Sequence, residues 1–438
     1  MRMLSLFLSA AALAAAAPPF RQSGFTAGPD GLPAGWRSWA ARAEMAPKTF
    51  VDQVHSRGEP GSLAISGNSN AAAAGGWEYA VTGVQPGQWY RLGASYRADA
   101  VNYEPLQVVA RLEWRTAEGK RAGQPDYAYA TRPEGDWRRV SLEAPAPEKA
   151  VAVAIQLWLE NAPQATVWWD DISLEPVAAP GPRQVTVAAL NFRPGKTSGA
   201  TESVSRFLEV IEKAVPGKAD LILLGEGITV VGTGKKYAEV AETVPGPTTA
   251  RLGEVAQKRN AYVAAGIYER EGAAIYNTAV LIDRRGRVAG KYRKVYLPRE
   301  EIEGGLTRGD DYPVFQTDFG KVGMMICWDL QYADPARALA LGGAELILLP
   351  IWGGNNALPK ARAIENQVFL ASSGYDHPTY ILDPDGETLA AAPERGQAAI
   401  ATLDLNRRYV DKWLGHMRGR FMKELRLDVP LRRPGFNQ

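Results

Sequence analysis

The hydrophobic pattern of this chain changes at a proline-rich segment, residues 177–182, and that change constrains the fold more than any other feature. Before the segment, short apolar runs alternate with polar residues, as at 77–81, 106–114 and 151–159. Such runs are typical of antiparallel strands with one buried face, whereas most runs after the segment are apolar at nearly every position. We therefore predict two domains, joined by a stiff linker over residues 179–183.

The first domain, residues 20–178, is predicted to be an antiparallel β-sandwich of the jelly-roll type. Polar turns such as 85–88 and 133–136 separate its apolar runs, as in sandwiches built from many short strands. The domain also holds nine of the twelve tryptophans of the chain, and most of these side chains are needed to fill the two inner faces.

The second domain, residues 184–405, is predicted to be a layered α/β domain. The runs 185–190 and 221–224 read as buried strands, and between them apolar residues recur at helical spacing from 204 to 215, with Ser203 as the expected N-cap. Strands that are apolar on both faces are buried between other layers. The basic and aromatic tail, residues 406–438, shows no pattern that places it.

The N-terminus has the features of a secretory signal peptide over residues 1–17. Arg2 precedes an apolar run at 4–17, and the run ends in an Ala-x-Ala cleavage motif before two prolines. The run is shorter than the ~20 residues needed to span a bilayer, which argues against a retained membrane anchor. We therefore expect the mature protein to be secreted or periplasmic, with no membrane span.

Composition excludes several functional classes. The 50 basic and 48 acidic residues give a net charge of +2, so no basic surface for nucleic acid is expected. A single cysteine rules out an intrachain disulfide and a cysteine-based zinc site, and three histidines argue against a histidine-rich metal centre. We expect no catalytic cofactor.

Three residues with catalytic potential each lie in or directly after an apolar segment: Glu226, Lys294 and Cys327. Side chains at the carboxyl ends of strands gather at one edge of a layered α/β fold, so the three can meet despite their distance in sequence. A carboxylate can accept a thiol proton, a thiolate can attack a carbonyl, and an ammonium group can stabilise the resulting oxyanion. The alternative is that Cys327 is a small buried hydrophobe.

The residues around these three positions resemble the carbon–nitrogen hydrolase (nitrilase) superfamily over about residues 184–405. The similar segments are the lysine motif Tyr-Arg-Lys-Val-Tyr-Leu-Pro at 292–298, the nucleophile segment Ile-Cys-Trp-Asp at 326–329, and Arg-Ala-Ile-Glu-Asn at 362–366. The resemblance implies a four-layer αββα fold, with Glu226 as general base, Cys327 as nucleophile, and Lys294 with the backbone N–H of Trp328 as oxyanion stabilisers. We expect the Lys294 charge to favour the thiolate form of Cys327.

Two further residues are candidates for the site. The resemblance implies a second glutamate in the segment 302–304, so Glu303 is expected to hold Lys294, with a solvated loop carboxylate as the alternative. Trp352 follows a predicted strand and is a candidate for the substrate pocket, with packing in the core as the alternative. The chain departs from the family pattern at Gly225, Tyr296 and the Ala-Asp pair at 333–334.

The resemblance predicts a hydrolase of small amide or ureide (N-carbamoyl) substrates that acts through a thioester. Nitrile hydrolysis by the same three residues is one alternative, and a catalytically silent glycan-binding protein is the other. Relatives usually associate through helices beside the nucleophile, here near residues 335–341, so a homodimer or larger homo-oligomer is expected.

The first domain is similar to carbohydrate-binding, galactose-binding-like jelly rolls at its two ends, residues 32–36 and 167–174. In such folds the closing acidic pair, here Asp170 and Asp171, often lies near a structural calcium ion, so calcium is expected as a possible ligand. Trp168 and Trp169 are adjacent in a predicted strand, so their side chains point to opposite faces. The outward one, or Trp36 or Trp77, is the candidate platform for a sugar ring; the alternative is that the domain packs on the hydrolase.

Overall fold

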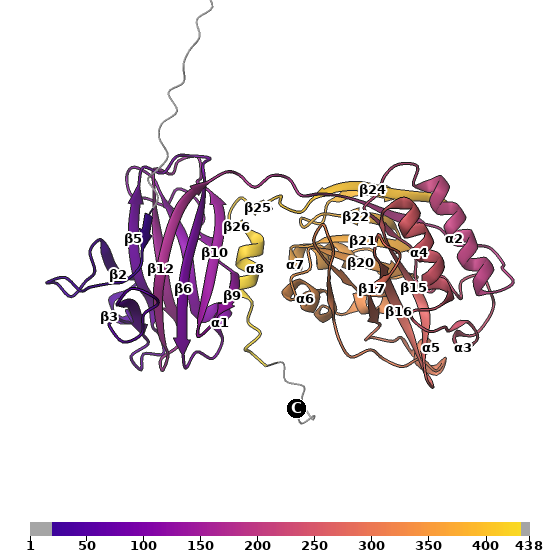
Figure 1. Ribbon diagram of the computed structural model, residues 1–438, viewed down its shortest axis with the longest axis horizontal. Helices are drawn as coiled ribbons and strands as arrows, with labels where there is room; N and C mark the ends of the chain where they lie inside the picture. The colour runs from indigo at the N-terminus through magenta and orange to yellow at the C-terminus, as the bar shows by residue number, and fades with distance from the viewer. Residues whose placement is uncertain (1–19, 431–438) are drawn as a thin grey trace, which may run out of the picture. The chain divides into compact units, whose positions relative to one another are not determined.

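The computed structural model describes residues 20–430, which form two compact units (Figure 1). One unit holds the described residues up to Pro180 together with those from Val410 onward, and the other spans Gly181–Tyr409. The predicted signal peptide, residues 1–17, lies outside the described residues. Within 20–430, no helix combines the length and the apolar character that a membrane span requires.

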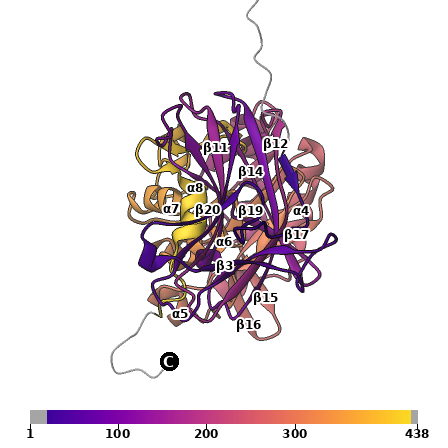
Figure 2. The same cartoon turned by 90° about the vertical axis from the view of Figure 1, so that its left-hand side faces the viewer.

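The first unit is an antiparallel β-sandwich, as predicted (Figure 2). One sheet has the strand order β3-β4-β12-β6-β10-β9, with β1 paired to β12, and the other has the order β2-β5-β11-β7-β8. The strands of the first sheet are β1 (Phe20–Gln22), β3 (Lys48–Asp52), β4 (Ser62–Ser66), β6 (Trp89–Asp99), β9 (Ala130–Glu134), β10 (Trp137–Pro145) and β12 (Thr166–Val177). Those of the second are β2 (Trp36–Ala40), β5 (Ala74–Thr82), β7 (Val108–Arg115), β8 (Asp126–Tyr127) and β11 (Ala152–Glu160), with the short helices η1 (Ala43–Met45) and α1 (Glu104–Gln107) in the connections.

The tryptophans of the sandwich are mostly structural. Trp168 and Trp169 do point to opposite faces: Trp169 belongs to the core between the sheets, and Trp168 does not. Yet Trp168 is also buried, because its ring packs against His55 and its Nε1–H donates to Asp52 at 2.8 Å. Trp36 and Trp77 are buried in the core. The predicted tryptophan platform for a sugar is therefore wrong at Trp168, Trp36 and Trp77.

The C-terminal tail belongs to the sandwich unit. It forms a small two-stranded sheet, β25 (Val410–Asp411) with β26 (Gly415–His416), and then helix α8 (Met417–Glu424). Helix α8 packs against α1 and β8, and both ribbon views show it beside the sandwich strands (Figures 1 and 2). The buried ammonium of Lys423 donates to the carbonyl of Val108 at 2.7 Å, which fixes the helix to β7.

The second unit contains two six-stranded sheets. The first has the order β17-β16-β15-β14-β13-β24 and the second the order β18-β19-β20-β21-β22-β23. The first comprises β13 (Gln184–Asn191), β14 (Leu221–Leu223), β15 (Tyr262–Glu271), β16 (Ala274–Ile282), β17 (Val288–Arg293) and β24 (Gln397–Asp404). The second comprises β18 (Val314–Gln316), β19 (Lys321–Met324), β20 (Leu346–Ile351), β21 (Phe369–Gly374), β22 (Thr379–Leu382) and β23 (Thr388–Ala392).

Helices cover the outer faces of both sheets, so the unit is the expected α/β/β/α arrangement. One apolar core lies between the sheets, and a second lies between the first sheet and helices α2 (Ala200–Ala214) and α4 (Pro247–Arg259). Helices α6 (Asp334–Leu341) and α7 (Leu358–Asn366) pack on the second sheet. The predicted N-cap Ser203 is wrong: it lies inside α2, where its hydroxyl donates to the carbonyls of Ile228 and Val231.

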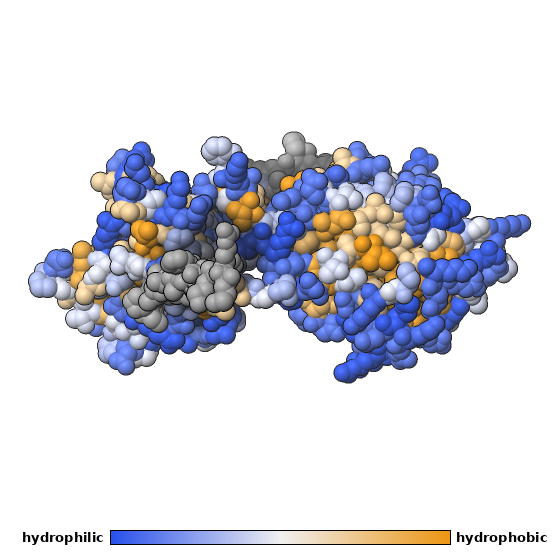
Figure 3. Space-filling view, turned by 90° about the horizontal axis from the view of Figure 1, so that it is seen from above, coloured by the Kyte–Doolittle hydropathy of each residue, from blue (hydrophilic) through white to orange (hydrophobic). Residues whose placement is uncertain are grey.

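The edge strands β23 and β24 lie next to each other and carry exposed apolar side chains. Leu389 on β23 and Ile400 on β24 are each 40% exposed. Figure 3 shows an apolar area on the face of this unit that carries β24. A solvated strand would normally carry polar residues on that face, so the pattern of β24 is unusual for an outer edge.

Candidate active site

Glu226 follows strand β14, and the surrounding backbone is shaped to admit it. The residue is 3% exposed, and its carbonyl accepts a hydrogen bond from the Tyr375 hydroxyl at 2.7 Å. A Cβ at Gly225 would lie 2.7 Å from that hydroxyl, which explains why this chain has glycine where its predicted family has proline. A Cβ at Gly266 on β15 would lie 2.8 Å from the Cα of Glu226. Strand β15 can therefore lie this close to the backbone of Glu226 only with glycine at position 266.

Lys294 lies directly after β17 and is 1% exposed. Its Nζ is 3.1 Å from Oε1 of Glu226 and 2.9 Å from Oε2 of Glu301. Asn277 on β16 joins the two carboxylates, because its Nδ2 donates to Glu226 at 2.8 Å and to Glu301 at 2.7 Å. Glu226 Oε2 is buried and accepts no hydrogen bond within the described chain, so one oxygen of this carboxylate stays available for a proton.

The second glutamate of the cluster is Glu301 and not Glu303, so the sequence analysis chose the wrong residue. Both lie on the short helix α5 (Arg299–Glu303), but they face opposite ways. Glu301 is 5% exposed and contacts Lys294, whereas the side chain of Glu303 is 61% exposed and pairs with Arg299 at 2.7 Å. The alternative prediction for Glu303, a solvated carboxylate, is confirmed.

Cys327 begins the 3₁₀ turn η2 (Cys327–Gln331), which follows β19. Its backbone has φ +43°, in the left-handed region that residues other than glycine rarely adopt. Asp329 holds this turn: its carboxylate accepts the N–H groups of Ile326 at 2.8 Å and of Tyr296 at 2.9 Å, and the hydroxyl of Tyr292 at 2.7 Å. Asp329 therefore connects the cysteine segment to the lysine segment on both sides of Lys294.

The thiol of Cys327 is neutral in the resting site. Burial raises its pKa to about 12, and the charge of Glu226 adds to this effect. The ammonium of Lys294 and backbone hydrogen bonds with Trp352 and Gly353 act in the opposite direction but do not outweigh burial. The Lys294 charge does favour the thiolate, as expected, but burial outweighs it and the resting thiol keeps its proton. A base must remove the thiol proton as the sulfur reacts.

Lys294 remains an ammonium ion. Burial by itself would lower its pKa, but the charges of Glu226 and Glu301 outweigh burial and raise it. Burial also raises the pKa of Glu301. The cluster thus places one fixed positive charge between two buried carboxylates, beside a neutral thiol.

Two departures from the family pattern contact each other. The hydroxyl of Tyr296 donates to the carboxylate of Asp334 at 2.6 Å, and Tyr312 donates to the same carboxylate at 3.2 Å. The ring of Tyr296 also stacks on Tyr332, with centroids 3.9 Å apart. Tyr296 and Asp334 are therefore partners in one hydrogen bond beside the lysine and cysteine segments, so each departure supplies the partner of the other.

The two tryptophans named from the sequence lie beside Cys327 in different ways. The N–H of Trp328 belongs to the first turn of η2, where backbone donors have no partner inside the helix, as the predicted oxyanion role requires. Trp352 directly follows β20 and packs edge-on against Tyr375, with centroids 5.0 Å apart. The structure places its backbone next to the thiol, while a role of its indole in substrate binding stays a prediction.

The acidic pair of the sandwich does not fit a calcium ion. Asp170 accepts the N–H groups of Gly24, Arg57 and Asp171, so both of its oxygens have donors. The carboxylate of Asp171 pairs with the guanidinium of Arg57 at 3.1 Å, a cation where calcium would have to bind. Residues 20–430 contain no cluster of three or more His, Cys, Asp or Glu side chains suited to a metal.

Sequence reasoning missed Asn277 and gave Asp329 no role. Both had a signal: each is a polar residue within or directly after a run of apolar residues, and buried polar groups need hydrogen-bond partners. Asn277 interrupts the apolar strand β16, and Asp329 lies two residues after Cys327. A polar residue at such a position is worth testing as a site residue.

Replacing Glu301 by glutamine is expected to lower kcat/KM by a factor between about 10² and 10³, because Lys294 loses the charge that positions its ammonium group. Glu303→Gln is the matched control, with the same chemical change two residues away, and should stay within about twofold of wild type. Steady-state kinetics of both variants measures this. Equal losses in the two variants would contradict the assignment of Glu301.

Comparison with known proteins gives matches to the second unit. A family described as carbon-nitrogen hydrolase matches residues 186–412. A hydrolase of Pseudomonas protegens is 34% identical over 205 residues, covering 42% of this chain and 69% of that protein. An omega-amidase of Xenopus tropicalis is 28% identical over 262 residues, covering 53% of this chain and 89% of that protein. A crystal structure of an amidase from Nesterenkonia sp. matches with 22% identity and a TM-score of 0.44, over 52% of this chain and 94% of that one.

Proposed function

Since the chain belongs to the carbon-nitrogen hydrolase family, we propose that it is an amidase that hydrolyses a small amide or N-carbamoyl substrate through a thioester on Cys327. The observation that carries the proposal is the buried cluster of Glu226, Lys294 and Glu301, in which the charges of Glu226 and Lys294 act on the thiol of Cys327. Enzymes of this family use no catalytic cofactor, so side chains of the protein make every proton transfer.

Acylation begins with attack of the Cys327 sulfur on the substrate carbonyl carbon. The carbon–sulfur bond forms as the thiol proton moves to Glu226, whose Oε2 has no other partner among the described residues. The carbonyl oxygen becomes an oxyanion, which the ammonium of Lys294 and the N–H of Trp328 stabilise. A neutral thiol with a nearby base suits this step, because no thiolate has to be kept in a buried site.

The intermediate then collapses to a thioester. The carbon–nitrogen bond breaks, and Glu226 gives its proton to the departing nitrogen, which leaves as ammonia or an amine. In the second half-reaction Glu226 takes a proton from water, and the water oxygen bonds to the thioester carbon. The carbon–sulfur bond breaks, the acid leaves, and the sulfur regains a proton. Glu226 acts in both halves.

The substrate class rests on the similar proteins. One of the similar proteins is named an omega-amidase, which supports amides as the substrates of this chain. We assign the cluster to amide or N-carbamoyl bonds of small molecules for this reason.

The test is ammonia or amine release by the full chain from a matched panel: short aliphatic amides, ω-amides of dicarboxylic acids, N-carbamoyl amino acids and the corresponding nitriles. Turnover of an amide or N-carbamoyl compound, absent in Cys327→Ala, is the expected result. Turnover confined to nitriles would favour the other reaction of the predicted family, and no turnover on any compound would contradict an amidase.

Export and self-association are also proposals. Export rests on the signal-peptide pattern of residues 1–17 alone, and cleavage after residue 17 would appear as a new N-terminus in the mature protein. Self-association is supported by Trp328 and Tyr332, which are 38% and 39% exposed just before the segment 335–341. A monomer in light scattering at micromolar concentration would contradict it.

A further inference from the structure

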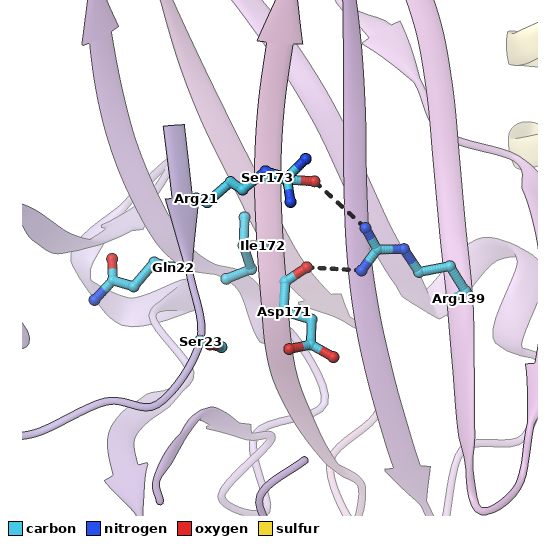
Figure 4. A pocket seen from close by; sticks show the side chains of 7 residues that line it. All are labelled: Arg21, Gln22, Ser23, Arg139, Asp171, Ile172 and Ser173. Carbon is cyan, nitrogen blue, oxygen red and sulfur yellow. Dashed lines mark hydrogen bonds between the residues drawn. The ribbon is translucent and has the colours of Figure 1, made fainter. Parts of the chain in front are cut away.

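One arginine of the sandwich lies flat across the outer face of a sheet. Arg139 starts on β10 and reaches over β6 to β12, because Gly93 on β6 has no side chain in the way. A Cβ at Gly93 would lie 2.3 Å from Nη2 of Arg139 and 3.0 Å from the hydroxyl of Ser173. Figure 4 shows the guanidinium reaching Ser173 and the backbone of Asp171 on β12.

Three acceptors hold the guanidinium in place. Nη1 donates to the carbonyl of Asp171 at 2.7 Å and to the hydroxyl of Ser95 at 3.3 Å, and Nη2 donates to the hydroxyl of Ser173 at 3.3 Å. Asp171 lies in a β-bulge and has φ +48°, so the bulge is part of this arrangement. The chain is thus built to fix the orientation of Arg139.

These bonds leave one edge of the guanidinium unused. Over the described residues, the Nε–H of Arg139 donates to no protein acceptor, and the side chain forms no ion pair. The nearby carboxylates of Asp171 and Glu134 act on its charge but pair with Arg57. The neighbouring Arg21, Arg91 and Arg132 each pair with a glutamate: Glu175, Glu143 and Glu134. Nε–H and the second hydrogen of Nη2 form the fork with which arginine binds a carboxylate in bidentate fashion.

Arg139 and Ser173 line two adjoining cavities, of about 340 and 440 Å³, which together we name the Arg139 groove. Each volume is within the range of about 300–1,000 Å³ that is usual for small-molecule sites. The lining is mainly polar. The other side chains that contribute polar groups are Arg21, Gln22, Ser23, Asp171, Arg91, Thr131, Arg132 and Ser141.

We propose that the Arg139 groove binds an acidic saccharide, with a sugar carboxylate on the open fork of Arg139 and sugar hydroxyls on the serine and threonine hydroxyls around it. The fork requires a planar oxyanion, and the polar lining suits a ligand rich in hydroxyl groups. Cavities on both sides of the arginine suit a chain of sugar units better than a single small anion. The site needs no tryptophan and does not depend on the hydrolase activity.

The test is affinity electrophoresis of the full chain in gels that contain polygalacturonate or its fully methyl-esterified form. The two polymers share one backbone and differ in charge at the carboxyl group. Wild type should be retarded by polygalacturonate and much less by the ester. Arg139→Gln should weaken this binding at least about tenfold, and Arg139→Lys, which keeps the charge but loses the fork, should weaken it to a smaller extent.

Arg42→Gln is the matched control, since it removes the same charge from an exposed position of the same unit outside the groove. Ser173→Ala is a second variant with a small structural change, and it should weaken binding by severalfold. Retardation that is equal in Arg139→Gln and Arg42→Gln, or equal with the esterified polymer, would overturn the proposal. So would equal binding of polyglutamate, which offers carboxylates without sugars, or no retardation at all.

Amide turnover measured on the same variants separates this proposal from the proposed function. Arg139→Gln should keep wild-type kcat on a small soluble amide, because Arg139 belongs to the sandwich unit and the catalytic cluster belongs to the other. A chain that binds polygalacturonate but hydrolyses no amide would refute only the hydrolase assignment, and the reverse result would refute only the groove.

Discussion

Replacement of Cys327 by alanine is expected to abolish amide hydrolysis while both units stay folded. The thioester needs a sulfur at this position, so kcat/KM should fall by a factor of about 10⁵ or more, as when other enzymes lose a catalytic nucleophile. Alanine is smaller than cysteine and keeps the Cβ that the left-handed backbone at φ +43° already accommodates. Circular dichroism and thermal unfolding should therefore match wild type within a few degrees.

Mass spectrometry adds a direct test of the same residue. Wild type mixed with a slow amide and stopped in acid should carry one acyl group on Cys327, and the alanine variant should carry none. Because Cys327 is the single cysteine of the chain, an adduct on sulfur has one possible position apart from methionine. Residual turnover above trace level in Cys327→Ala would exclude the thioester mechanism.

The replacement Glu226→Gln should have the second-largest effect. Glutamine has nearly the same shape as glutamate but cannot accept the thiol proton, and both half-reactions need that transfer. Loss of a general base costs about 10²–10⁴-fold in rate, and a residue used twice should fall at the upper end of this range. Glu303→Gln again serves as the control for a glutamate-to-glutamine change in the same unit.

The pH dependence of thiol alkylation separates a lost base from a damaged site in Glu226→Gln. The negative charge of Glu226 disfavours the thiolate and so contributes to the raised pKa of Cys327. Removing that charge should lower the pKa of Cys327, so the rise of iodoacetamide reactivity with pH should move to lower pH in the variant. Turnover would thus be lost while the sulfur became more reactive. An unchanged profile would show that Glu226 does not act on Cys327.

The parts of the site that the sequence predicted are those fixed by the order of strands. Glu226, Lys294 and Cys327 each lie at or just beyond the end of an apolar segment, and packing of the two sheets brings such ends together. The lysine and the glutamate indeed lie 3.1 Å apart although 68 residues separate them in sequence. The strand pattern allowed these residues to meet, and the resemblance to the family singled them out.

Two kinds of feature could not be predicted from the sequence. One is which side chain of a short helix faces the site, and the other is whether residues distant in sequence bury an outward side chain. Helix α5 has a single turn of five residues. That is too short for the spacing of apolar residues to show whether Glu301 or Glu303 faces Lys294. The alternation along β12 does place Trp168 on the outer face. Its burial, however, depends on His55 and Asp52, more than a hundred residues earlier, and no local pattern reports that.

The return of helix α8 to the sandwich also has a consequence for the synthesis of the protein. The bond from Lys423 to Val108 joins residues 315 positions apart, and the whole α/β unit lies between them in the chain. At about 5–20 residues per second, a ribosome needs on the order of half a minute to cover that distance. The sandwich strands emerge first but wait without their last helix while the α/β unit is made. A fragment that ends at residue 178 would remain in this unfinished state, with the carbonyl of Val108 lacking its partner.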